Sequence, residues 1–280
     1  MSAATLNRAA SGTADRRAVV VQPVTFLRVL RSEWIKVRSL RSTKITLAVA
    51  VVLMAGIGMM SAAITASQWS RLPAASRASF DAVSTVLQGH QFAQLAIGVL
   101  GVMLVSSEYS TGMIRATLTA VPRRLPVLWA KSGVFAAVTL VSMTLASFAA
   151  YFGGMSLLSS RHLQASLSAP GVTRAVIGAA LYLTVVGLLG VALGALLRHT
   201  AGAIAVLVGL LLLAPVFVNL LPSSIKSAIS PYLPSNAGDA LLNVRQQAGT
   251  LSPWAGFAVM CAYAVVALAA AALVLRRRDA

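Results

Sequence analysis

Long apolar runs alternate with short polar segments along this chain. A helix needs about 20 mainly apolar residues to cross the hydrocarbon of a bilayer. Six runs are long enough, at about 44–66, 87–107, 126–154, 173–197, 201–221 and 254–275. Only three residues separate the fourth run from the fifth. The pattern predicts an all-α integral membrane protein with six transmembrane helices.

The segment before the first run has a different pattern, with basic residues between apolar ones. In VTFLRVLRSEWIKVRSLRS (24–42), apolar side chains recur at helical spacing at Leu27, Leu30, Trp34 and Val37. A helix with an apolar face and basic flanks lies in the head-group region of a membrane. We therefore predict an N-terminal amphipathic interfacial helix. Its expected interfacial residues are Arg31, Trp34, Lys36 and Arg38.

Two further segments complete the expected domain organisation. Prolines break the stretch 222–253 into short pieces, which predicts two short outer helices between helices five and six. Residues 1–22 are rich in Ala, Ser and Arg, without the apolar core of a secretory signal. They weakly resemble an organellar transit peptide, but a disordered cytoplasmic tail is the favoured interpretation. Residues 23–280 then form a single six-helix transmembrane domain.

Composition agrees with the membrane class. The chain has 58% hydrophobic and 10% charged residues, whereas soluble domains have about 25% charged residues. Its net charge of +17 does not indicate nucleic-acid binding, because the basic residues flank apolar runs. In that position they set orientation and contact anionic lipids.

The same basic residues orient the chain. Seventeen of the 23 Lys and Arg residues fall on the side that holds both termini, and six fall on the other. The excess belongs in the cytoplasm. We expect a multi-pass protein of the cell (plasma) membrane with both termini cytoplasmic.

Motifs that carry chemistry are missing from the sequence. It has no HExxH zinc motif and no GxSxG nucleophile elbow, and no lysine follows a glycine as a phosphate loop requires. We therefore expect no enzyme, no catalytic residue and no metal site on this chain. Asp81 and Asp239 are expected outside, and Glu33 and Glu108 inside, with no carboxylate pair at membrane depth. This argues against an ion-gradient-driven carrier.

Two groups of residues within the runs have local patterns. Three amides are expected to share one face of the second helix, where they line a translocation path or bond a neighbouring helix: Gln88, Gln91 and Gln94. Small residues in GLLGVALG let helices approach closely: Gly187, Gly190 and Gly194. Packing inside the bundle is favoured over a dimer interface.

The polar segment SSEYSTGMIRATLTAVPRR (106–124) connects the second and third runs. Apolar residues from Met113 to Val121 follow near-helical spacing, Gly112 permits a bend, and Pro122 ends the helix. We predict a short amphipathic cytoplasmic helix. Such a helix suits a groove on a partner protein or the lipid surface, and the residues alone leave both open.

The chain resembles the membrane subunit of an ATP-binding cassette (ABC) transporter, of the ABC-2 type permease family. EYSTGMIRATL is the most specific part, and LRSEWIKVRSLRSTK with the six runs extends the resemblance over nearly the whole chain from about residue 24. The Ala-, Val- and Arg-rich composition is similar to that of actinobacterial permeases.

The resemblance implies an exporter whose energy comes from a separate ATPase subunit, which would carry the ATP and Mg. It also implies a second permease copy or paralogue. A coupling helix at about 108–124 would contact the ATPase through Glu108, Tyr109, Thr111, Gly112, Arg115, Pro122, Arg123 and Arg124. The alternatives are an ion-gradient-driven carrier and a non-transporting membrane partner or sensor.

Overall fold

The computed structural model describes residues 25–113, 125–246 and 249–277, and every regular element in them is helical. Six helical segments there are long and apolar enough to cross a membrane: Arg41–Arg71, Ala82–Ser110, Leu125–Arg161, Val172–Leu197, Thr200–Asn219 and Pro253–Arg277. They coincide with the six predicted runs, which confirms an all-α multi-pass membrane protein. The predicted tail at 1–22 and most of the predicted coupling helix lie outside the described residues.

The helices of the membrane-spanning segments follow one another in chain order. They are α2 (Arg41–Gln68), α4 (Ala82–Leu87), α5 (His90–Ser110), α7 (Leu125–Leu158), α8 (Val172–Leu197), α9 (Thr200–Val208), α10 (Ala214–Asn219) and α13 (Pro253–Arg277). The shorter helices outside them are α1 (Phe26–Ser39), α3 (Ala74–Ala78), α11 (Ser223–Ile229) and α12 (Pro234–Leu242). Single 3₁₀ turns occur at Trp69–Arg71, Ser159–Arg161 and Ser230–Tyr232.

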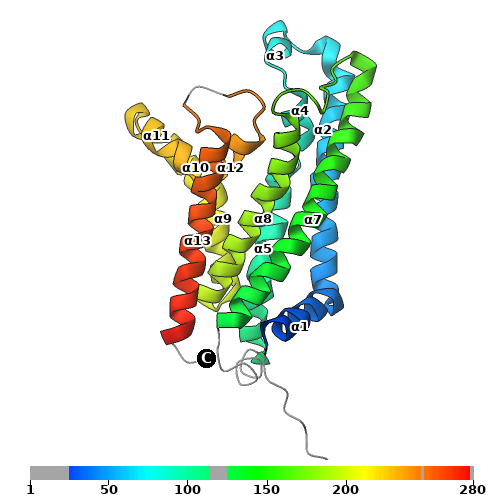
Figure 1. Ribbon diagram of the computed structural model, residues 1–280. Coiled ribbons are helices and arrows are strands. Elements are labelled where there is room, and N and C mark those ends of the chain that lie inside the picture. The colour runs from blue at the N-terminus through cyan, green and yellow to red at the C-terminus, as the bar shows by residue number, and fades with distance from the viewer. Residues whose placement is uncertain (1–24, 114–124, 247–248, 278–280) are drawn as a thin grey trace, which may run out of the picture.

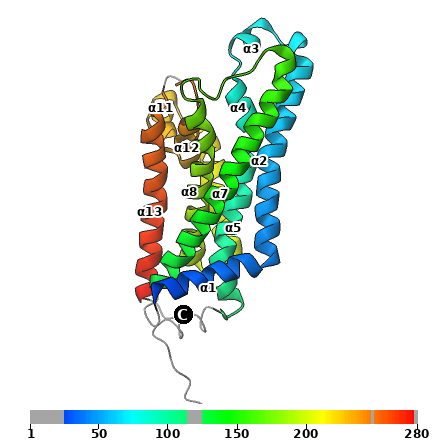
Figure 2. The same ribbon diagram turned by 45° about the vertical axis from the view of Figure 1, so that its right-hand side comes forward.

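The bundle has two distinct ends. Helix α1 and the end of α13 lie at one end, called the lower end here, and α3, α11 and α12 lie at the upper end (Figure 1). Helix α1 runs across the lower end, where it packs mainly on α7 (Figure 2). Helix α8 is central, because 78% of its most apolar stretch is buried against protein, compared with 17% in Thr200–Asn219.

Glycines bring α5 and α8 into close backbone contact. A Cβ atom added at Gly190 would lie 2.4 Å from the carbonyl oxygen of Gly98, and one at Gly101 would lie 2.2 Å from that of Gly187. A Cβ at Gly194 would lie 2.7 Å from the Val102 carbonyl oxygen. Small residues allow this approach between membrane helices. The three glycines noted on α8 therefore pack inside the bundle.

The fifth span is interrupted before Pro215. Residues Gly209–Leu213 form a π-helical turn, in which the amide of Ala214 donates to the carbonyl of Gly209. Proline has no amide hydrogen, and its ring clashes with the carbonyl four residues earlier in a regular helix. An inserted π turn relieves that clash by shifting the local register. The sequence pattern showed an unbroken helix here, because the interruption is itself apolar.

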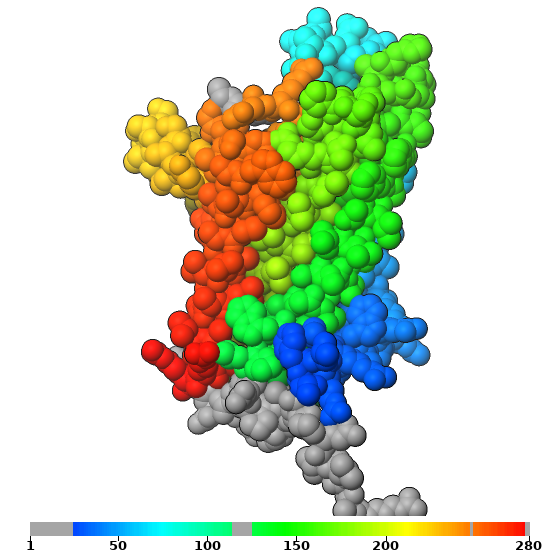
Figure 3. Space-filling view, in the orientation of Figure 1, coloured from blue at the N-terminus to red at the C-terminus, as the bar shows by residue number. Residues whose placement is uncertain are grey.

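The two short helices predicted between spans five and six are present, with different environments. Helix α11 has no buried residue and projects from the upper end (Figure 3). Helix α12 packs on α13 and α8, and buries Ala240 and Leu241.

The helix predicted before the first span is present as α1, and one side of it packs on the bundle. Its buried residues are Val29, Glu33 and Val37, while Leu27 is 76% exposed and Trp34 is 48% exposed. Glu33 lies on the packed side, where it pairs with Lys36 and Lys131. Apolar periodicity could not anticipate a buried charge.

Candidate functional site

Four charged side chains from three helices meet at the lower end of the bundle. The Lys131 Nζ atom on α7 lies 2.7 Å from Glu33 Oε2 on α1 and 2.9 Å from Glu108 Oε1 on α5. Lys36 Nζ, one turn beyond Glu33, lies 2.7 Å from Glu33 Oε1 and 3.0 Å from Glu108 Oε1. We call these four residues the ion-pair network. It joins α1 to both α5 and α7.

Three members of the network are almost completely removed from solvent. Glu33 is 1% exposed, Lys131 3% and Glu108 4%. Burying a charge is costly unless it is paired and hydrogen-bonded. Two ammonium groups meet two carboxylates here, so the charges balance and both lysines donate hydrogen bonds.

Lys36 is the most accessible member, with a side chain that is 28% exposed. Burial lowers the pKa of Lys36, but its hydrogen bonds and charge interactions with Glu33 and Glu108 outweigh that effect and raise the pKa above the ordinary 10.5. Lys36 is therefore charged at neutral pH.

The network brings together two acidic residues that were expected on the same side of the membrane. Glu33 and Glu108 share one lysine, and Glu33 and Lys131 are site residues that sequence reasoning missed. The available signals were weak: Glu33 is the only acid in a basic segment, and Lys131 lies within an apolar run. Their meeting depends on α1 folding back across α7.

The last turn of α5 is also held on another side, by the turn that joins α8 to α9. The hydroxyl of Thr200 donates to Ser106 Oγ at 2.8 Å. The guanidinium carbon of Arg198 lies 5.1 Å from the ring centroid of Tyr109, which is close enough for a cation–π contact. Arg198 ends α8 with a left-handed φ of 54°. This end of α5 is therefore anchored to α1, α7 and the α8–α9 turn.

The chain leaves α5 where the sequence predicted a bend. Thr111 donates its hydroxyl hydrogen to the carbonyl of Ser107, and Gly112 has a φ of +72°, a conformation that glycine adopts without strain. The remaining predicted coupling residues lie outside the described residues: Arg115, Pro122, Arg123 and Arg124. Beside the network, side chains of α2 and α5 line a cavity of about 390 Å³.

Other predicted site residues are distributed over both ends. On α1, Arg31, Trp34 and Arg38 are exposed, whereas Lys36 is part of the network. A short turn at Gln88 and Gly89 separates α4 from α5, and the amides of Gln91 and Gln94 lie next to each other. Gln94 is buried and accepts a hydrogen bond from the Tyr182 hydroxyl on α8.

Gln88 and Gln91 instead line a pocket at the upper end of the bundle. His90, between them, contacts Asp239 of α12, and sequence reasoning missed this pair as well. No group of three or more His, Cys, Asp and Glu side chains in the described part of the chain could hold a metal ion.

No known protein-family model matches the chain, and no curated protein matches it. The fold defines a multi-pass α-helical membrane protein.

Proposed function

We propose that this chain is the membrane-spanning permease subunit of an ABC-2 type exporter, energised by a separate ATPase. The anchoring of the last turn of α5 carries the proposal. Through Glu108, Ser106 and Tyr109, this turn contacts α1, α7 and the α8–α9 turn immediately before the segment expected to couple to the ATPase. A force applied to that segment would reach several spans together.

The mechanism follows from this geometry. ATP binding would draw two ATPase subunits together and displace the coupling segments of two paired permease chains. A ligand shifts a conformational equilibrium only by as much as its contacts differ between the two states. Short, buried ion pairs are costly to break, so they would stay intact during the displacement. Helix α5 would therefore move together with α1 and α7. Glu108 then acts as a positioning residue, since its carboxylate is buried among helices of this chain.

In this proposal the lower end faces the cytoplasm and the upper end faces outwards, with the chain in the plasma membrane. The exposed Arg31 and Arg38 of α1 would contact anionic lipid head groups of the inner leaflet. ATP and Mg would be bound by the ATPase alone. The proposal also includes contacts of Tyr109, Thr111 and Arg115 with the surface of the ATPase.

The direct test is affinity purification of the full chain from membranes of its native host in a mild detergent. We expect an ATPase with a Gly-Lys phosphate loop to co-purify and to hydrolyse ATP. Glu108→Gln should lower chain-dependent ATP hydrolysis by at least about tenfold, roughly 1.4 kcal/mol of coupling, while the chain still inserts.

Asp81→Asn is the matched control, because it also neutralises an acid but at the upper end, where asparagine can still cap α4. It should leave ATP hydrolysis unchanged. Absence of any nucleotide-hydrolysing partner, or equal effects of both variants, would contradict the proposal.

An ion-gradient-driven carrier is a second candidate, favoured by the buried Lys131 and the His90–Asp239 pair, which were not expected from the sequence. Ionisable groups buried among the helices of a membrane protein mark ion pathways in many transporters. Reconstituted vesicles distinguish the two candidates: the exporter requires its ATPase and ATP, whereas the carrier responds to a proton or sodium gradient alone. Co-purification without stimulated hydrolysis would favour a non-transporting membrane partner.

A further inference from the structure

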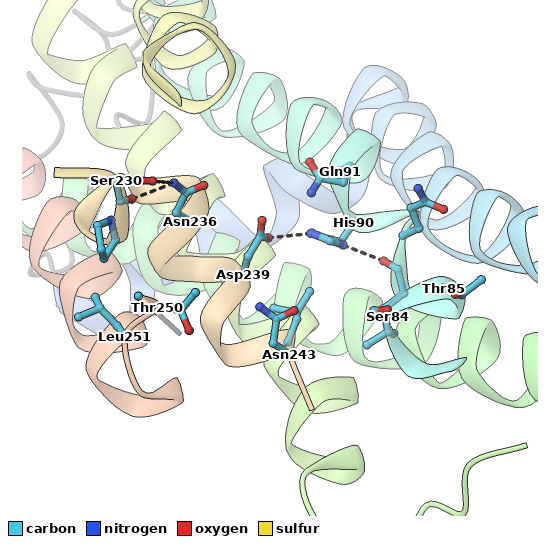
Figure 4. A pocket seen from close by; sticks show the side chains of 15 residues that line it. Ser84, Thr85, His90, Gln91, Ser230, Asn236, Asp239, Asn243, Thr250 and Leu251 are labelled. Atoms are coloured by element: carbon cyan, nitrogen blue, oxygen red, sulfur yellow. Dashed lines mark hydrogen bonds and ion pairs between the residues drawn. The ribbon is translucent and has the colours of Figure 1, made fainter. Parts of the chain in front are cut away.

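A pocket of about 600 Å³ lies at the upper end, between the α4–α5 junction, α12 and residues 249–251. Figure 4 shows side chains from both sides directed towards this shared space. The volume is in the range of small-molecule sites, about 300–1,000 Å³, but such sites are usually lined by apolar groups. Here hydroxyl and amide side chains predominate, among them Ser84, Thr85, Gln91, Asn236, Asn243 and Thr250.

His90 and Asp239 form a hydrogen-bonded pair on the wall of this pocket. His90 Nδ1 lies 2.8 Å from the Leu87 carbonyl oxygen, and Nε2 lies 2.9 Å from Asp239 Oδ1 (Figure 4). A carbonyl oxygen can only accept, so Nδ1 carries a hydrogen. A carboxylate also only accepts, so a second proton must lie between Nε2 and Asp239. Whichever partner holds that proton, the pair has no net charge.

The surrounding charged and titratable groups do not change this balance. On α8, Tyr182 meets the His90 ring edge to face, with centroids 6.0 Å apart, and donates its hydroxyl hydrogen to Gln94. Asp81 caps α4 through the amides of the helix start, and Arg174 donates to the Asn243 carbonyl. Among the described lining residues, only His90 and Asp239 are ionisable.

We propose that this pocket is a binding site for a neutral ligand rich in hydroxyl and amide groups, such as a saccharide or the glycosyl part of a larger molecule. Amides and hydroxyls supply donors and acceptors side by side, as such a ligand does. An apolar ligand would offer no hydrogen bonds to the side-chain amides of Gln88, Gln91 and Asn243, which line the pocket. Because the His90–Asp239 pair has no net charge, it offers no counter-charge to an ionic ligand.

The ligand would reach the pocket from the aqueous side at the upper end, because Gln91 is exposed and the Asp239 side chain is 31% exposed. Contacts to both α5 and α12 would hold these helices together. This inference extends beyond the proposed transport function. It requires no ATPase, so its success or failure is independent of that proposal.

The test uses the purified full chain in lipid nanodiscs without an ATPase, titrated at pH 6 with three related sugars and followed by saturation-transfer NMR. The neutral probe is N-acetylglucosamine, the cationic probe glucosamine and the anionic probe glucuronate. We expect saturable binding of N-acetylglucosamine, with both charged sugars binding at least about tenfold more weakly. Equal binding of all three, or no saturable binding of the neutral sugar, would overturn the proposal.

Variants then locate the site. Gln91→Leu should weaken N-acetylglucosamine binding at least about tenfold. Gln164→Leu is the matched control, because Gln164 donates to the Met155 carbonyl outside the pocket, and it should have no effect. Equal losses from the two variants would contradict the assignment.

Charge variants provide a readout that does not depend on lost binding. His90→Leu leaves the Asp239 carboxylate without its proton-sharing partner, so the preference should shift towards glucosamine. Asp239→Asn offers an amide donor to the neutral ring and should keep the preference for the neutral sugar. An unchanged preference in His90→Leu would show that the pair does not set ligand charge.

Discussion

At the residue scale, Lys131 organises the lower end of the bundle. Its ammonium group donates to carboxylates from two different helices, and its side chain is almost fully buried. Replacing a buried charge leaves its partners unpaired, which costs more than the pair itself contributes. Lys36 contacts the same two carboxylates but is partly exposed, so water can replace it.

This difference predicts unequal stability losses. Lys131→Met should destabilise the protein by about 3–5 kcal/mol, because two buried carboxylates then share only the partly exposed Lys36. Lys36→Met should cost clearly less, since Lys131 continues to bridge Glu33 and Glu108. Heat or denaturant unfolding of the purified variants in detergent measures the two losses of stability. Equal losses would show that the two lysines do not differ as their burial implies.

The contribution of Lys36 to stability should also be insensitive to pH near neutrality. A raised lysine pKa contributes stability that is fully present below the ordinary value of 10.5 and is lost as the pH rises through the higher folded-state pKa. The Lys36 contribution should therefore be constant from pH 6 to 9. The measurement is the stability difference between wild type and Lys36→Met across that range. A difference that disappears by pH 8 would contradict the assignment.

At the scale of elements, glycine contacts between α5 and α8 set the centre of the bundle. Without a hydrophobic driving force between helices in lipid, close packing supplies much of their association. The backbones meet at Gly98 with Gly190 and at Gly101 with Gly187, so there is no flexible side chain to move aside.

The contact predicts that Gly190→Ala destabilises the fold by about 1–3 kcal/mol, the usual cost of overpacking. Gly133→Ala on α7 is the matched control, because an added Cβ there meets nothing within 4 Å. Alanine's higher helix propensity should leave that variant unchanged or up to about 1 kcal/mol more stable. Thermal unfolding of both variants checks the prediction. A neutral Gly190→Ala would mean that the helices are less closely packed than described.

At the scale of the whole molecule, both described chain ends of the domain lie at the lower end, as six spans require (Figure 1). The basic residues in the described parts of α1 and at the end of α13 also gather there. We expect the lower end to face the cytoplasm.

Cysteine labelling tests this orientation. Cys261 is the only native cysteine, so Cys261→Ala provides a background for single exposed cysteines. Ser76→Cys and Ser227→Cys at the upper end should react with an impermeant maleimide on intact cells. Ser39→Cys at the lower end should react only after permeabilisation. The reverse pattern would invert the topology and the proposed side of the pocket.

The sequence by itself determined the six spans, the polar connections between them and the missing phosphate loop. These are properties of short stretches, because hydrophobicity over about 20 residues decides whether a helix can cross a bilayer. The bend at Gly112 was also readable, since glycine there permits a left-handed φ.

Only the tertiary structure decided which polar groups meet. Glu33 and Lys131 are 98 residues apart, and His90 and Asp239 are 149 apart. No local pattern encodes such pairs, because they depend on how α1 crosses α7 and how α12 folds back on α5. In α1 the side that packs on the bundle includes Glu33 with its ion pairs, and apolar periodicity cannot indicate a buried charge.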